Sequence, residues 1–395
     1  MKHKDIPMSR FRDEDIRLDL LRKYSANQWA KYPHEVIPLT AADPDFQVAE
    51  PIRKAIIQTA IDGVFSYGAD GGNLEFREAC ARHVKERKGL KCVTEDVHAL
   101  NGVAQGMMLT CKSLLKLGDE AIIFDPVDFL FGKSIEAAGA KRVLSEIDWN
   151  TLSFDLERLK ELVTPRTKMI CICNPHNPYG RVLRKEELQA MVDLAEDHNL
   201  WIMSDEIWSD IIYDGRKHIP TASLPNAPER TITLYGFSKT FAMAGLQLGF
   251  MVTQNQKLLK HIKDTVPGYF YPVNNISQIA GTAALNECWD WATEFIIHLE
   301  KVRDYVYERL VSIPKIEAHK PEGTYVIFPK IQGMSSVEAT EYLFKEAKVA
   351  VVPGHGHPFS YFGPGGEGHI RIVYSTSIEI IEEAMNRIEA ALTKL

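Results

Sequence analysis

Lys239 is the residue whose surroundings first indicate chemistry. It lies in Ser238-Lys239-Thr240, after the apolar run 231–235 and before the small-residue stretch 242–245. An amine held between a buried strand and a tight turn can lose its proton and form a Schiff base with an aldehyde. Most lysines are solvated surface charges, so this residue alone carries little weight. A chemical role for Lys239 therefore depends on partners elsewhere in the chain.

Two upstream residues supply such partners. Asp205 follows the apolar run 200–203, and Asn177 lies in a turn after the apolar run 168–173. Pyridoxal phosphate needs a lysine for its aldehyde, a carboxylate for its ring nitrogen and a donor for its phenolic oxygen. Each segment singly is explained equally well as a turn or a helix cap. All three together, each after an apolar strand, predict a pyridoxal phosphate site.

The same segments resemble a known family. Over essentially its whole length, the chain is similar to fold-type I pyridoxal-phosphate enzymes of the class I and II aminotransferase superfamily. Asn-Pro-His-Asn-Pro at 174–178 and Ser-Asp-Glu-Ile at 204–207 resemble its cystathionine β-lyase-like branch. Gly-His-Ile-Arg-Ile at 368–372 resembles an aspartate-type aminotransferase instead. The resemblance implies pyridoxal 5'-phosphate as the cofactor and small-molecule amino acids and 2-oxo acids as partners.

The resemblance also implies an α/β fold. A large domain with a mostly parallel, seven-stranded-type sheet flanked by helices is expected at 46–290. A smaller α+β domain, formed by 1–45 and 291–395, is expected to close over substrate. The residues themselves favour this division, because apolar strands alternate with amphipathic helices from about 95 to 250 and shorter elements follow a long helix at 292–310. Strands are predicted at 120–124, 169–173, 201–204, 231–234, 248–252, 324–328 and 371–374, and later helices at 338–346 and 378–395.

Two further segments could bind anions. Arg371 lies on an apolar strand, where its planar fork suits a substrate α-carboxylate, although a structural salt bridge would explain it as well. Gly102, Val103 and Ala104 open a helical pattern, so their backbone amides could hold the cofactor phosphate. An ordinary helix start explains that segment equally well.

The resemblance implies roles for further residues. Tyr67 corresponds to a tyrosine that reaches the phosphate in the neighbouring subunit, so a homodimer is expected. Asn177 and Ala42 are expected to contact substrate as well. The remaining expected cofactor contacts are Ser238, Gln247, Trp208 and Phe129.

Four positions depart from the usual aminotransferase pattern. Gln247 stands where a phosphate-binding arginine is usual, and Gly236 where a serine is usual. Each change removes a charge-assisted hydrogen bond worth about 1.5–3 kcal/mol. Trp208 replaces a tyrosine that bonds the phenolic oxygen, and its indole N–H cannot reproduce that hydroxyl. Asp128 stands where an aromatic ring is expected to stack on the cofactor, and we expect the neighbouring Phe129 to take that role only after a strand shift.

Bulk properties exclude several classes of protein. The 395 residues are 45% hydrophobic and 25% charged, as in soluble globular proteins. A mild net charge of −7 gives no basis for binding nucleic acid or an anionic membrane. No apolar run approaches the ~20 residues of a membrane span, and no secretory leader is expected. Six cysteines without a regular framework favour reduced thiols in the cytoplasm. His355 and His357 have no third ligand at suitable spacing, so no metal is expected.

Three reactions fit these residues. We prefer an aminotransferase, which moves an amino group between an L-amino acid and a 2-oxo acid, with Lys239 moving the proton and Arg371 fixing the carboxylate. A carbon–sulfur β-lyase of the cystathionine β-lyase type would share the steps to the carbanion and then expel a thiolate. A regulatory or binding protein on the same scaffold is the third alternative. The preferred side chain stays open, and Tyr269 and Tyr271 are expected either at the substrate entrance or in a subunit interface.

Overall fold

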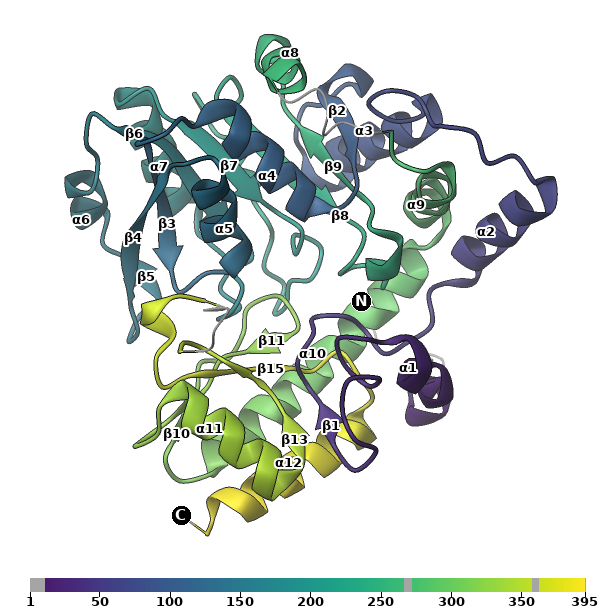
Figure 1. The fold of residues 1–395 in the computed structure, drawn as a ribbon, viewed down its shortest axis with the longest axis vertical. Helices are drawn as coiled ribbons and strands as arrows, with labels where there is room; N and C mark the ends of the chain where they lie inside the picture. Colours follow the sequence, from purple (N-terminus) through teal and green to yellow (C-terminus); the bar gives the residue numbers. More distant parts are fainter. Residues whose placement is uncertain (1–10, 266–271, 357–361, 395) are drawn as a thin grey trace.

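The computed structural model describes residues 11–265, 272–356 and 362–394 (Figure 1). Within these ranges the main element is an eight-stranded sheet with the strand order β2-β9-β8-β7-β6-β3-β4-β5. The four pairings between β8 and β4 are parallel. At the edges, β9 runs antiparallel to β8 and β2, and β5 runs antiparallel to β4. The predicted mostly parallel sheet is confirmed, with the two-residue β5 as an eighth strand. The bounds are β2 (Val97–Leu100), β3 (Glu120–Asp125), β4 (Lys141–Asp148), β5 (Ser153–Phe154), β6 (Thr167–Cys173), β7 (Trp201–Asp205), β8 (Thr231–Gly236) and β9 (Gly249–Val252).

The register brings three strand ends level with one another. Cys173 at the end of β6 pairs with Asp205 at the end of β7, and Asp205 pairs with Leu234 near the end of β8. Parallel strands end at the same sheet edge, where ligands of such sheets bind. The chain therefore turns back at this edge just before Asn177, at Asp205 and just before Lys239.

Helices cover both faces of this sheet, as Figure 1 shows for α4 and α5 on one side. Met169 and Cys171 of β6 pack in one apolar cluster with Met107 of α4, whereas Ile170 and Ile172 pack in another with Leu188 of α7. Successive side chains of a strand point to opposite faces, so a sheet buried on both faces needs the continuous apolar runs seen in the sequence. The helices around the sheet are α2 (Glu50–Asp62), α3 (Leu74–Lys88), α4 (Val103–Leu114), α5 (Phe129–Ala137), α6 (Leu156–Glu161), α7 (Lys185–Asp197), α8 (Gln256–Thr265) and α9 (Asn275–Glu287).

A second group of elements follows the long helix α10 (Trp289–Ser312), which confirms the helix predicted at 292–310. These elements lie below the large sheet in Figure 1. A three-stranded sheet has the order β11-β15-β14, and β1 of the N-terminal segment pairs in parallel with β13, which ties the two ends of the chain together. The strand expected at 324–328 is shorter than predicted. The bounds are α1 (Leu18–Tyr24), β1 (Ile37–Pro38), β10 (Ile316–Glu317), β11 (Val326–Ile327), β12 (Lys330–Ile331), α11 (Ser336–Tyr342) with a π-helical turn at Leu343–Ala347, β13 (Val349–Ala350), β14 (Val352–Pro353), β15 (Ile370–Val373) and α12 (Ile378–Leu392).

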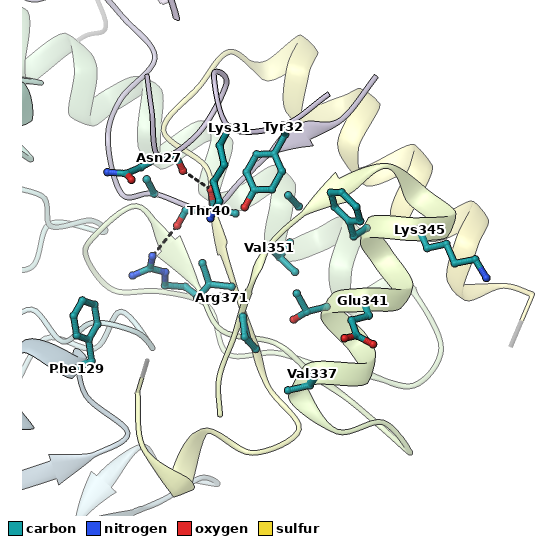
Figure 2. A pocket seen from close by; sticks show the side chains of 16 residues that line it. Asn27, Lys31, Tyr32, Thr40, Phe129, Val337, Glu341, Lys345, Val351 and Arg371 are labelled. Carbon is teal, nitrogen blue, oxygen red and sulfur yellow. Dashed lines mark hydrogen bonds between the residues drawn. The ribbon is translucent and has the colours of Figure 1, made fainter. Parts of the chain in front are cut away.

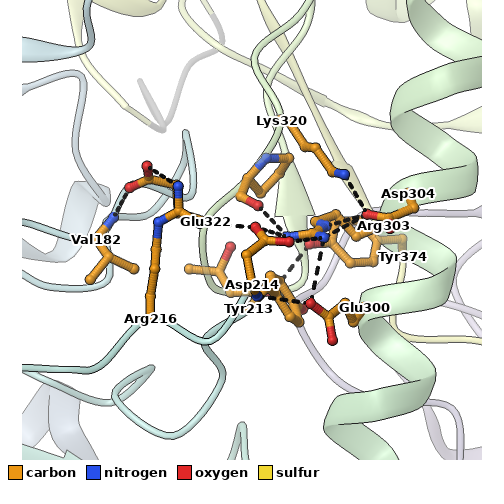
Figure 3. A network of polar contacts seen from close by, with 12 residues as sticks. Val182, Tyr213, Asp214, Arg216, Glu300, Arg303, Asp304, Lys320, Glu322 and Tyr374 are labelled. Carbon is orange, nitrogen blue, oxygen red and sulfur yellow. Dashed lines mark hydrogen bonds and ion pairs between the residues drawn. The ribbon is translucent and has the colours of Figure 1, made fainter.

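A buried arginine joins these two groups of elements (Figure 3). Arg303 on α10, with 1% of its side chain exposed, donates to both carboxylate oxygens of Asp214 at 2.8 and 2.9 Å. It also donates to the carbonyl oxygen of Pro321 at 3.1 Å. Asp214 lies after β7 and Pro321 lies before β11, so one guanidinium holds the long helix against loops from both groups.

Two general features concern the helices and the thiols. Among the described residues, no helix combines the length and the apolar character that crossing a bilayer requires. All six cysteines are buried and carry free thiols, as the sequence predicts.

Candidate active site

A cavity of about 480 Å³ lies at the level ends of β6, β7 and β8. Most of the residues predicted for catalysis and for cofactor and substrate binding converge on it from seven separate segments of the chain. Of the predicted set, the cavity is lined by Ala42, Gly102, Val103, Ala104, Phe129, Asn177, Asp205, Trp208, Ser238, Lys239, Gln247 and Arg371.

Lys239 is half-buried in the cavity wall, three residues after β8. Its Nζ donates a hydrogen bond of 2.6 Å to the carbonyl oxygen of Ala42 and lies 5.1 Å from the ring centroid of Trp208. Burial lowers the pKa of this amine to about 8, although the carboxylate of Asp43 acts in the opposite direction. The lowered pKa increases the fraction of neutral amine near neutral pH, and the neutral form is the one that a nucleophile or general base requires.

Asp205 is the last residue of β7 and only 5% exposed. Its Oδ1 accepts a hydrogen bond of 3.1 Å from the backbone N–H of Ile207. Burial raises the pKa of the carboxyl to about 7, and no salt bridge to Asp205 is found within the described ranges. A protonated ring nitrogen beside this carboxylate would supply the missing positive charge. The residue therefore fits a pyridinium-type cofactor.

Glu206, the next residue, has a pKa that is shifted in the opposite direction. It is fully buried, and its carboxylate accepts hydrogen bonds from Tyr235 at 2.8 Å and from the backbone N–H of Thr221 at 3.0 Å. His218 Nε2 lies 2.7 Å from the same carboxylate. Burial alone would raise the pKa of Glu206, but His218 and these hydrogen bonds hold it below its usual value. This network fixes the end of β7 beside the cavity, and no sequence pattern had indicated it.

Asp128 lines the cavity, but both of its carboxylate oxygens accept hydrogen bonds within the chain. Its Oδ1 accepts from the backbone N–H of Leu130 at 3.0 Å and so caps α5, while its Oδ2 accepts from Nδ2 of Asn177 at 2.9 Å. An aspartate is a favourable N-cap, which accounts for a carboxylate at a position where an aromatic residue was expected. Phe129, the first residue of α5, also lines the cavity.

Arg371 lies on β15 at the border of the cavity and is 8% exposed. One guanidinium nitrogen donates to Oδ1 of Asn177 at 3.3 Å, and another donates to the carbonyl oxygen of Thr40 at 2.7 Å. The carbon of the guanidinium lies 5.0 Å from the ring centroid of Phe362. The guanidinium lies at the cavity border, where its planar fork suits a substrate carboxylate.

The N-terminus of α4 forms the opposite wall. Gly102 is its N-cap with φ of +85°, a conformation that favours glycine, and Val103 and Ala104 begin the helix. A helix N-terminus carries partial positive charge and unpaired backbone N–H groups, so it suits a phosphate. Gln247 lines the same cavity with φ of 47°. This donor set, together with Lys239 and Asp205, fits pyridoxal phosphate.

Other predicted residues lie elsewhere. Tyr67 does not line the cavity of its own chain and is 89% exposed. Tyr269, Tyr271 and His357 lie outside the described residues. In the part of the chain that the structure describes, no group of three or more His, Cys, Asp or Glu side chains could hold a metal ion.

The sequence did not predict the contacts that two backbone carbonyl groups make at the site. The carbonyl oxygen of Ala42 also accepts from the hydroxyl of Tyr325 at 2.9 Å, and the carbonyl oxygen of Thr40 holds Arg371. A main-chain acceptor leaves no signal in the residue type. These contacts place the N-terminal segment directly against the lysine and the arginine.

The comparisons with known proteins agree with this geometry. Residues 34–388 match the family model of class I and II aminotransferases. An aspartate aminotransferase of Pyrococcus horikoshii is 38% identical over 366 residues, which cover 91% of each chain. Aromatic-amino-acid aminotransferase 2 of Thermococcus litoralis is 36% identical over 90% of this chain and 92% of its own. A PLP-bound structure from Clostridium difficile, described as an aminotransferase, aligns with a TM-score of 0.89 and 28% identity, covering 96% of this chain and 100% of that one.

Proposed function

The chain belongs to the class I and II aminotransferase family and is a pyridoxal-phosphate-dependent aminotransferase, and we propose that Lys239, Asp205 and Arg371 carry its reaction. It moves an amino group between an L-amino acid and a 2-oxo acid, and its relatives favour this reaction over the β-lyase alternative. When bound, the cofactor supplies an electron-withdrawing ring that stabilises negative charge at the substrate α-carbon.

Lys239 is proposed as the covalent attachment point for the cofactor's aldehyde and as the proton carrier. The observation that carries this proposal is the amine at the sheet edge with a pKa lowered to about 8. Once released by substrate, Nζ is placed to take the proton from the substrate α-carbon. Its contact with the carbonyl oxygen of Ala42 keeps the free amine at the cavity wall.

The remaining cavity residues are proposed to bind and orient. Asp205 would pair with the ring nitrogen, and Arg371 would hold the substrate α-carboxylate together with Asn177 and the segment at Ala42. The amides of Gly102, Val103 and Ala104 would hold the phosphate, with Ser238 and Gln247 beside it. Phe129 and Trp208 would border the cofactor ring.

The working unit is proposed to be a cytoplasmic homodimer. Apolar side chains are exposed around Tyr67: Ile61 is 71% exposed and Phe65 is 65% exposed. Covering such side chains in water is favourable, so a second copy seated there would stabilise the assembly. Tyr67 would then reach the partner's cavity. The six free thiols agree with a reducing compartment.

The division of the chain into two domains is proposed on the same basis. The large domain would span 46–290 and carry the eight-stranded sheet. The small domain, formed by 1–45 and 291–395, would carry Arg371 and close over the substrate, with α10 as the connection.

A coupled assay tests the proposed residues and the reaction together. The holoenzyme is incubated with a panel of L-amino acids, with and without 2-oxoglutarate, and glutamate and pyruvate are measured. Glutamate that forms only when the acceptor is present is expected, and Arg371→Lys should raise KM by at least about tenfold, because a bidentate contact is lost. Pyruvate and thiol released from cystathionine without an acceptor would overturn the assignment of the reaction.

A further inference from the structure

A second cavity of about 780 Å³ adjoins the first (Figure 2). It lies between the N-terminal segment, helix α11 and the strands β13 and β14. Arg371 and Phe129 line both cavities, so the two spaces meet at the guanidinium. A molecule whose carboxylate binds Arg371 and whose α-carbon faces Lys239 can therefore direct its side chain toward the entrance of this second space.

The inner wall of the second cavity is apolar. Val351 and Val352 are 4% and 8% exposed, and Pro353 follows them. Val337 on α11 completes this wall from the opposite side. An apolar side chain that leaves water for such a wall gains free energy in proportion to its buried area.

Aromatic rings flank the same space. Tyr32 from the N-terminal segment and Phe344 after α11 have ring centroids 6.0 Å apart. Phe129 borders the end nearest the first cavity. Ring pairs at such distances attract a further ring through edge-to-face or offset contacts.

The charges of the cavity are distributed unevenly. Lys31, Glu341 and Lys345 are exposed residues at its rim, and the amine of Lys31 lies 5.3 Å from the ring centroid of Tyr32. Among the described lining residues, Arg371 is the buried cation, and its proposed partner is the α-carboxylate. A second carboxylate on a short side chain would leave water without meeting a buried positive charge, which is costly.

We propose that this second cavity receives the substrate side chain and selects a large, mainly apolar side chain with an aromatic ring over a short side chain that ends in a carboxylate. The inference rests on the proposed contact between Arg371 and the α-carboxylate. The volume supports it, because about 780 Å³ exceeds the needs of a short side chain and lies within the usual range for small-molecule sites.

Hydrogen bonds of the N-terminal segment connect the lining of this cavity to Arg371. Thr40 Oγ1 donates to the carbonyl oxygen of Asn27 at 3.1 Å, and the carbonyl oxygen of Thr40 accepts from Arg371 at 2.7 Å (Figure 2). Asn27 and Thr40 both line the cavity. A side chain that packs against this segment therefore also steadies the guanidinium that holds its carboxylate.

The test places a bulky side chain in the second cavity by substituting Val337, a partly exposed residue on α11. In the holoenzyme with 2-oxoglutarate as acceptor, wild type should show a kcat/KM for L-phenylalanine at least about tenfold above that for L-aspartate. Val337→Trp should lower the value for phenylalanine at least about tenfold and that for aspartate less than about threefold. Thr340→Trp, one turn later on α11, provides a second filling variant if the first fails to fold.

Val311→Trp is the matched control, because Val311 is 45% exposed on α10 and does not line either cavity. It should leave both substrates unchanged. A wild-type preference for aspartate, or an equal loss for both substrates in the filling variants, would overturn the inference while the aminotransferase reaction stands. Absence of turnover with every amino acid would overturn the proposed site and this inference with it.

Discussion

The strand-end cavity and the junction around Arg303 both bury charged side chains, but they balance those charges differently. At the junction, burial alone would lower the pKa of Arg303, yet the hydrogen bonds that it donates to Asp214 and Asp304 raise it (Figure 3). The hydrogen bond with Arg303 in turn lowers the pKa of Asp214. In the cavity, burial dominates, and Asp205 and Lys239 have pKa values of about 7 and about 8.

This difference distinguishes a structural cluster from a binding site. Each buried charge at the junction has its partner within the chain, so the cluster is complete when the protein is folded. Within the described residues Asp205 and Lys239 make no salt bridge, and burial outweighs the charges around them, which is a cost that a bound molecule can relieve. The contrast predicts that changes at the cavity affect activity and that changes at the junction affect stability.

Replacing the cavity amine should have the largest effect. Lys239→Ala removes both the covalent attachment point and the proton carrier, so kcat should fall at least about 10³-fold. Steady-state transamination and the borohydride-sensitive absorbance of bound cofactor measure the two roles. Lys260→Ala, an exposed helix position, serves as the control. A Lys239→Ala protein that keeps a tenth of wild-type turnover would contradict the proposed role.

Asp205→Asn should separate activity from stability. Loss of the charge beside the ring nitrogen should lower kcat/KM about a hundredfold. At pH 8 the cofactor-free variant should nevertheless unfold at a higher urea concentration than the wild type. Its free energy of unfolding should be larger by on the order of 2 kcal/mol, because a buried carboxylate without a salt bridge is removed.

The pH dependence of that difference follows from the sign of the pKa shift. The pKa of Asp205 is higher in the folded protein than in the unfolded chain, so its favourable contribution is present at acid pH and is lost as the pH rises toward about 7. The advantage of the cofactor-free Asp205→Asn variant should therefore shrink as the pH is lowered from 8 to 5. Urea titrations at several pH values measure it, and a pH-independent difference would show that burial of charge is not its cause.

Asp214→Asn should give the opposite pattern at the junction. The substitution weakens two charge-assisted hydrogen bonds to a guanidinium that stays buried, so the protein should lose about 2 kcal/mol of stability. The expected loss is already set below that of a fully buried ion pair, because the side chain of Asp214 is 39% exposed and solvent screens the interaction. Chemical denaturation measures the loss, while kcat/KM should change less than about twofold. Asp264→Asn, in an exposed pair with Lys260, should have almost no effect on either quantity.

The smallest expected change concerns the phosphate side of the cavity. Gln247→Arg adds a charged donor beside the N-terminus of α4, so the cofactor Kd should fall about fivefold. The backbone at this position has φ of 47° in either case, so the strain is the same for both side chains. Fluorescence titration of the cofactor-free protein measures the affinity, with Gln247→Leu as the control of similar size. Equal affinities for the arginine and leucine variants would show that the phosphate lies elsewhere.

The sequence was sufficient to predict the main sheet and the convergence of Asn177, Asp205 and Lys239. Apolar runs mark buried parallel strands, and the polar residue after each run must emerge at the shared edge. The long helix α10 was also found, because its apolar spacing continues for many turns. These features depend on patterns that are local along the chain.

Features built from distant residues were not predicted. The direction of the Asp128 carboxylate depends on a helix that begins at the next residue and on Asn177, which is 49 positions away. The second cavity combines the N-terminal segment with α11 and β14, so no single stretch of sequence indicates it. The Glu206 network likewise needs the fold to bring His218 and Tyr235 together.

The carbonyl oxygens of Thr40 and Ala42 have an evolutionary consequence. They hold Arg371 and Lys239 through the main chain, which every residue type provides. Substitution at position 42 leaves the acceptor of Lys239 in place, and substitution at position 40 leaves the acceptor of Arg371 in place although it removes the hydroxyl that binds Asn27. A single-residue insertion or deletion between them would displace both acceptors at once, so this short stretch should tolerate replacement far better than a change of length.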